Sequence, residues 1–215
     1  DNCLSFAFEM EKQERDTKGL VKVLEPLRAL YSPRNLAEPE KIAIRCQEGL
    51  ALCKQEQDRE SQSEILLYVG KTLEKQDKLE EALVVFEESV SLRTADDLAG
   101  KFFSLSRIGQ VLRKKKMYEQ ALEKYEEGLI FAKRSGDIIA QAWALQDIGD
   151  TYREQGRIDE SVSKYAEIVK IVAQSTNLSS KAYVLHCIGE SYRNAGKFDE
   201  ALAQFERSLQ LRKEL

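Results

Sequence analysis

The sequence predicts an all-α protein built as a solenoid of antiparallel helix pairs, and three observations carry this prediction. Gly70, Gly109, Gly149 and Gly189 recur at intervals of 39, 40 and 40 residues, each inside the same apolar pattern. A fixed period of this length is the sequence signature of a repeat architecture. Helix-forming residues dominate between these glycines, and the 215 residues include only three prolines.

One copy illustrates how each pair is expected to form. It carries Leu145, Ile148, Gly149 and Tyr152 on its first helix and Ile158, Ser161, Tyr165 and Val169 on its second. Apolar residues three and four positions apart predict amphipathic helices. We expect Gly149 to let the second helix approach near Ser161, with Tyr152 and Tyr165 filling the space beside that contact. One pair cannot bury its apolar stripe alone, so its neighbours must cover it.

The glycines and the breaks between periodic stretches place the elements in order. The predicted helices are, pair by pair, 60–76 with 79–94, 97–116 with 118–135, 138–156 with 158–175, and 179–196 with 198–213. They give repeats at 57–95, 96–135, 136–175 and 176–215 in one continuous array. Pro39 suits the first position of an earlier helix, so residues 17–56 are predicted to be a degenerate first repeat. Residues 1–16 are predicted to be a fragment of a preceding helix, in a chain cut from a longer protein.

Composition excludes several classes of function. The net charge of −4 disfavours nucleic acid as a partner, and no segment has the apolar length of a membrane span. Cys3, Cys46, Cys53 and Cys187 form no zinc-type spacing, so we expect neither a metal site nor a cofactor. They are predicted to be reduced, mostly buried thiols of a cytoplasmic protein.

The repeated residues resemble the tetratricopeptide family, whose motif places a large residue, Leu-Gly and a Tyr on the first helix and Ala, an aromatic residue and Ala on the second. Residues 60–215 carry this pattern and 17–56 carry it weakly. The period is near 40 rather than 34, Leu replaces the family's Trp, and the closing proline is absent. Such long repeats resemble those of kinesin light chains, Pins-type adaptors and bacterial peptide-sensing regulators of the Rap type. The resemblance implies a right-handed superhelix whose concave groove, lined by the first helices, holds a partner peptide.

The resemblance also implies which residues line that groove. They comprise three aromatic residues, three arginines and the polar residues between them: Phe103, Trp143, Tyr183, Gln110, Arg113, Gln146, Asp150, Arg153, His186, Glu190 and Arg193. Aromatic residues and arginine most often carry interface energy, and arginine grips carboxylates with two bonds. The implied ligand is therefore an acidic peptide with apolar anchors.

Each of these assignments has a structural alternative. The aromatic residues could be packing ribs between neighbouring first helices. Arg153 and Arg193 could pair on their own helices with Asp150 and Glu190, three residues earlier. Arg113 has Gln110 at that place, which makes residues 113–116 (Arg-Lys-Lys-Lys) the best candidate anion site, although cations are also favoured at a helix C-terminus.

The sequence thus predicts a protein-interaction scaffold that binds a partner peptide and is not an enzyme. His186, the only histidine, has no partners for a catalytic triad, and no catalytic residue is expected. The alternative is a regulatory arm that senses a peptide or small ligand and controls an effector domain outside this chain. The last helix has no visible cap, so its end is expected either to be covered by further sequence or to pair with another copy.

Overall fold

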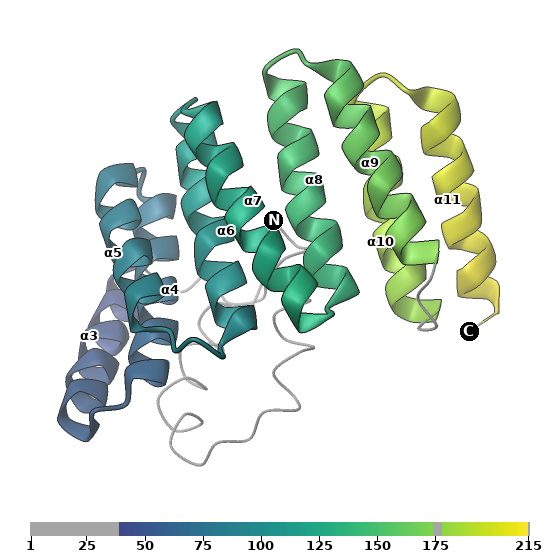
Figure 1. Ribbon diagram of the computed structural model, residues 1–215. Coiled ribbons are helices and arrows are strands. Elements are labelled where there is room, and N and C mark those ends of the chain that lie inside the picture. Colours follow the sequence, from purple (N-terminus) through teal and green to yellow (C-terminus); the bar gives the residue numbers. More distant parts are fainter. Residues whose placement is uncertain (1–38, 174–177, 215) are drawn as a thin grey trace. The chain divides into compact units, whose positions relative to one another are not determined.

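The computed structural model describes residues 39–173 and 178–214, and Figure 1 shows their helices. In order these are α3 (Pro39–Glu56), α4 (Arg59–Lys75), α5 (Leu79–Leu92), α6 (Leu98–Lys114), α7 (Tyr118–Ser135), α8 (Ile138–Glu154), α9 (Ile158–Ala173), α10 (Leu178–Asn194) and α11 (Phe198–Lys213). No strand occurs in this part of the chain. The all-α prediction is confirmed, and the predicted bounds of α4 to α11 agree within two residues.

These helices belong to two compact units that divide between residues 92 and 93. In the first unit, α4 packs against both α3 and α5, and α3 begins at Pro39 as expected. The second unit holds three complete pairs, α6 with α7, α8 with α9, and α10 with α11. The expectations for residues 1–16, and for 17–38 of the degenerate repeat, lie outside the described residues.

In the second unit the first helix of each pair lies beside the first helix of the next. Helix α8 contacts both α6 and α10, while α7 packs on α6 and α8, and α9 packs on α8 and α10. The principal contacts between pairs therefore involve a first helix in every case. We call α6, α8 and α10 the first-helix layer, because it joins the three pairs to one another.

Each pair is closed by an aromatic ring of its second helix lying over the glycine of its first. A Cβ atom on Gly149 would lie 2.5 Å from Cε1 of Tyr165, and one on Gly109 would lie 2.5 Å from the same atom of Tyr125. Phe86 and Phe205 cover the remaining two repeat glycines in the same way. The glycine thus makes room for this ring, which occupies the space that a Cβ atom would need.

The four turns inside the pairs share one backbone closure. Asp77, Lys116, Gly156 and Gly196 have φ between 60° and 78°. The N–H of the following residue donates to the carbonyl five positions earlier, at 2.9 Å in every case. This is the six-to-one bond of a Schellman motif, which satisfies the last carbonyls of the first helix.

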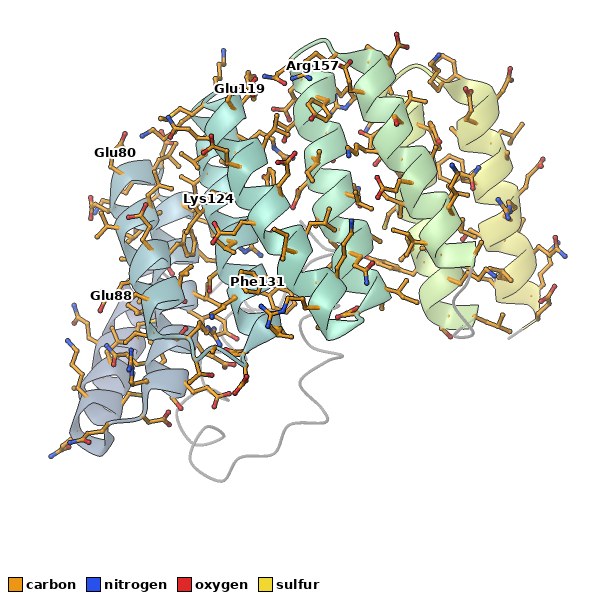
Figure 2. The ribbon with its side chains drawn as sticks, in the orientation of Figure 1. Glu80, Glu88, Glu119, Lys124, Phe131 and Arg157 are labelled. Carbon is orange, nitrogen blue, oxygen red and sulfur yellow. The ribbon has the colours of Figure 1, made fainter. Side chains whose placement is uncertain are left out.

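Between pairs, aspartate side chains cap the next helix. Asp97 accepts from Gly100 N at 2.9 Å, and Asp137 accepts from Ile139 N at 2.8 Å. Contacts at the helix ends add to this: Gln155 donates to Glu119 at 2.9 Å, and Arg157 lies 3.9 Å from the same carboxylate. Figure 2 shows Glu119, in the first turn of α7, near Arg157, in the turn between α8 and α9. These contacts link α7 to the turn after α8.

The cysteines that the structure describes, Cys46, Cys53 and Cys187, are buried, as expected from the sequence, and no disulfide joins any two of them. Cys3 lies outside the described residues. A search of the described helices for one with the length and apolarity needed to cross a bilayer finds none.

Candidate functional site

A polar cluster of the second unit lies between α6 and α8, where three α6 side chains donate to one α8 carboxylate. Ser106 Oγ donates to Asp147 Oδ2 at 3.1 Å, and Gln110 Nε2 lies 3.4 Å from the same oxygen. Arg113 Nη1 lies 3.5 Å from Oδ1. The Asp147 cluster, comprising Ser106, Gln110, Arg113, Asp147 and Glu154, therefore joins two consecutive repeats.

Arg113 pairs with two acidic groups of α8. Besides Asp147, its Nε lies 3.7 Å from Glu154 Oε1, and its side chain is 21% exposed. Sequence reasoning considered only its own helix, where Gln110 offers no charge. The structure shows that its acidic partners come from the next repeat.

Burial and charge compete at Asp147. Burial raises the pKa of this carboxyl group, because the charged form loses hydration, and the nearby Arg113 guanidinium acts in the opposite direction. The pKa remains above its ordinary value. For Arg113, burial is the largest single influence and lowers the pKa, but the negative charges around it, that of Asp147 foremost, together outweigh burial and raise the pKa.

Two equivalent tyrosines differ in their hydrogen bonds. The Tyr165 hydroxyl donates to Asp150 Oδ1 at 2.7 Å. At Tyr125 the corresponding position on the first helix is Gln110, whose Oε1 accepts from Arg107 at 3.0 Å. The Tyr125 hydroxyl is buried and has no hydrogen-bond partner among the described residues. Burial raises its pKa, and the charge of Asp147 raises it further.

Two of the three predicted aromatic residues, Phe103 and Trp143, pack against each other. The rings of Phe103 and Trp143 lie 6.3 Å apart between centroids at an interplanar angle of 51°, and Phe102 lies 5.1 Å from Phe103. Trp143 is only 6% exposed, whereas Phe103 and Tyr183 are half-buried. This geometry matches the packing ribs that the sequence left open as an alternative.

The other two predicted arginines contact acidic residues of their own helices. Arg153 Nε lies 3.7 Å from Asp150 Oδ1, and Arg193 pairs with Glu190. These are the i,i+3 pairs considered from the sequence as an alternative to ligand binding. Both arginines keep exposed area, and the Arg193 side chain is 54% exposed.

The remaining predicted residues lie on α8 and α10. Gln146 Nε2 donates to Ser191 Oγ at 3.1 Å, and the exposed His186 ring lies 5.4 Å from Phe205. The structure thus brings Gln110 and Arg113 together with Asp147, and Gln146 together with Ser191. Glu190, Arg193 and His186 form a more exposed group on α10.

Sequence reasoning missed Asp147, although a signal was present. At the place two residues before the glycine, the other copies have Tyr68, Arg107 and Cys187. A carboxylate there departs from the pattern, and its donors Ser106 and Arg113 lie more than thirty residues earlier. Only the alignment of successive first helices brings them together.

Comparison with known families agrees with this architecture. Two family profiles described as tetratricopeptide repeat match residues 102–174 and 182–215. A search of curated proteins finds no match.

Solved structures with the same fold include three that match over more than 90% of this chain. A Podospora anserina putative kinesin light chain with nearly identical repeats has a TM-score of 0.66 at 15% identity, covering 91% of this chain and 95% of that one. BtubC from P. vanneervenii has a TM-score of 0.57 at 16% sequence identity, and the match covers 93% of this chain and 92% of BtubC. The apo form of RapI has a TM-score of 0.68 at 13% identity, and the match covers 91% of this chain and 70% of RapI. At such identities the likeness concerns the fold alone.

Proposed function

Because this chain belongs to the tetratricopeptide-repeat family, we propose that it is a protein-interaction scaffold whose first-helix layer binds an acidic peptide segment of a partner. The ligand would lie across α6, α8 and α10. The proposal retains the residues predicted from the sequence, and assigns the charged part of recognition to α6 and the turn after it.

The observation that carries the proposal is the charge of α6. This helix contains Lys101, Arg107, Arg113 and Lys114 and no acidic residue, and Lys115 and Lys116 extend the run, although the chain has a net charge of −4. Lys114 and Lys116 are exposed. An electropositive surface on an acidic protein steers and selects acidic partners.

Half-buried aromatic residues supply the apolar part of the proposed site. Phe103 and Tyr183 retain exposed area on α6 and α10, and aromatic side chains are enriched among residues that dominate binding energy. Trp143 contributes mainly by holding Phe103 in place, since their rings are in contact.

The test uses charge reversal at exposed positions, so that folding is preserved. We expect the double variant Lys114→Glu, Lys116→Glu to lose binding to acidic peptides in a peptide-array and fluorescence-anisotropy assay. The control, Lys133→Glu with Arg134→Glu, makes the same charge change at exposed positions of α7. An equal loss of peptide binding in both variants would mean that net charge alone accounts for the effect. No loss of binding in either variant would contradict the proposed site.

A second proposal concerns self-association through α11. Phe198, Leu202 and Leu209 are 69%, 58% and 55% exposed. The equivalents of the two leucines in α7 are Leu122 and Leu129, which are buried, and α7 packs against the following helix α8. We propose that a second copy of the chain covers this apolar face.

A further inference from the structure

We infer that Asp147 is an internal counter-ion that competes with the ligand for Arg113, and that it thereby sets the affinity of the first-helix layer for acidic peptides. The inference rests on the proposed function and adds a residue that contributes to specificity without touching the ligand. In the free protein, Asp147 holds Arg113 against α8. When a ligand carboxylate binds, the guanidinium turns toward it.

The contacts of Arg113 leave its donors poorly satisfied. A guanidinium presents five N–H donors, and strong charge-assisted bonds have N···O distances of about 2.7–2.9 Å. Every acceptor of Arg113 among the described residues lies at 3.5 Å or beyond: Asp147 Oδ1 and its backbone oxygen at 3.5 Å, and Glu154 at 3.7 Å. A carboxylate bound in bidentate fashion would form shorter bonds, and the partly exposed side chain of Arg113 is accessible to it.

Asp147 keeps hydrogen-bond donors when Arg113 leaves. Ser106 at 3.1 Å and Gln110 at 3.4 Å both donate to its Oδ2, while Arg113 contacts Oδ1. The buried Tyr125 hydroxyl, which has no hydrogen-bond partner among the described residues, lies close enough for the charge of Asp147 to raise its pKa. The exchange therefore leaves the carboxylate supported, which lowers its energetic cost.

The arrangement is specific to the contact between α6 and α8. In α10 the residue equivalent to Asp147 is Cys187, which is buried and carries no acceptor of comparable strength. Arg153, the equivalent of Arg113 on α8, pairs with Asp150 of its own helix. Arg113, in contrast, is held by a carboxylate of the following first helix.

The test measures binding of a fluorescein-labelled hexaglutamate peptide to the full chain by anisotropy. Asp147→Asn keeps an oxygen acceptor for Ser106 and Gln110 but removes the charge that competes for Arg113. We expect it to bind the probe about tenfold more tightly than wild type, which corresponds to about 1.4 kcal/mol. A purely structural role for Asp147 predicts weaker binding instead, so the sign of the change is diagnostic.

Two controls isolate the pair. Glu127→Gln makes the same change of net charge on α7, where this carboxylate pairs with Lys124 at 3.2 Å, and we expect its affinity to stay within about twofold of wild type. In an Arg113→Gln background, adding Asp147→Asn should no longer increase the affinity for the peptide, as a double-mutant cycle requires of a coupled pair. A gain that appears in Glu127→Gln, or that persists without Arg113, would overturn the inference.

A measurement on the wild-type protein covers the case in which Asp147→Asn does not fold. We expect hexaglutamate to shift the NMR signals of the Arg113 Nε–H and of the Asp147 carboxyl carbon together. Binding that depends on Lys114 and Lys116 but shifts neither signal would overturn this inference and leave the proposed function intact. If hexaglutamate fails to bind wild type and every variant, both proposals fail.

Discussion

The ring of Tyr165 lies directly over Gly149, at a distance where a Cβ atom on residue 149 would be 2.5 Å from Cε1 of the ring. The absent side chain and the aromatic ring therefore form one packing unit. Since Tyr165 is fully buried, the ring has little freedom to move aside.

Gly149→Ala should accordingly destabilise the protein despite the better helix propensity of alanine. We expect a loss of about 1–3 kcal/mol in the free energy of unfolding, the usual range for overpacking, measured by urea denaturation. Gly128→Ala is the matched control, because a Cβ there would meet nothing closer than 3.5 Å. It should be neutral or stabilising by up to about 1 kcal/mol, and an equal loss in both variants would contradict the packing argument.

Removing the hydroxyl groups of the two equivalent tyrosines should have different effects. Tyr165→Phe breaks the 2.7 Å bond to Asp150 and should lower the free energy of unfolding by about 0.5–1.5 kcal/mol. Tyr125→Phe removes a buried hydroxyl that has no hydrogen-bond partner among the described residues, so it should be neutral or stabilising. Thermal and urea unfolding of both variants would measure these two changes in stability. A larger loss of stability for Tyr125→Phe would show that the Tyr125 hydroxyl has a hydrogen-bond partner in solution.

The stability of wild type relative to Asp147→Asn should depend on pH. The pKa of Asp147 is raised in the folded protein above its value in the unfolded chain, chiefly by burial. Ionisation therefore costs stability, and this cost is absent below the unfolded pKa and complete above the folded pKa. As the pH falls from about 7 to about 4, wild type should gain stability relative to the asparagine variant. A difference that stays constant over this range would show that the folded and unfolded pKa values are equal.

The described thiols should resist modification in the native protein. Burial raises the pKa of Cys46 to about 12, and Cys53 and Cys187 are buried as well. Because the thiolate is the reactive form, iodoacetamide at about pH 8 should label none of the three in a Cys3→Ser background until denaturant is added. Mass spectrometry of the native protein would identify any thiol that reacts.

Self-association through α11 should be abolished by one charge in its apolar face. We expect light scattering to show dimers at high concentration for wild type and monomers for Leu202→Lys. Val84→Lys is the control, since Val84 is a comparably exposed apolar residue on α5, at 64%, and isolated exposed residues of this kind are ordinary. A monomeric wild type would refute the proposed pairing.

The fold followed from local patterns, while the candidate site did not. The recurrence of Gly149 and its equivalents, with apolar residues on either side, located eight helices, because both helices of a pair lie within one period. The partner of Arg113 lies in the next period. Its identity depends on how α6 and α8 align, and spacing within a single helix carries no information about that. The role of the aromatic residues could not be decided from the sequence either. Aromatic side chains suit both a binding surface and a packing contact such as that between Phe103 and Trp143.

The common closure of the turns has a consequence for how such a chain can change length. Lys116 and Gly156 adopt the same left-handed conformation, and the same pair of backbone bonds ends the helix before each. A duplicated segment of one period would carry its own closing turn, its own glycine and its own ring. Gene duplication can therefore add whole helix pairs to this protein without requiring a new type of turn. Sequence changes with structural effect would then fall first at positions such as Asp147, where one repeat contacts the next.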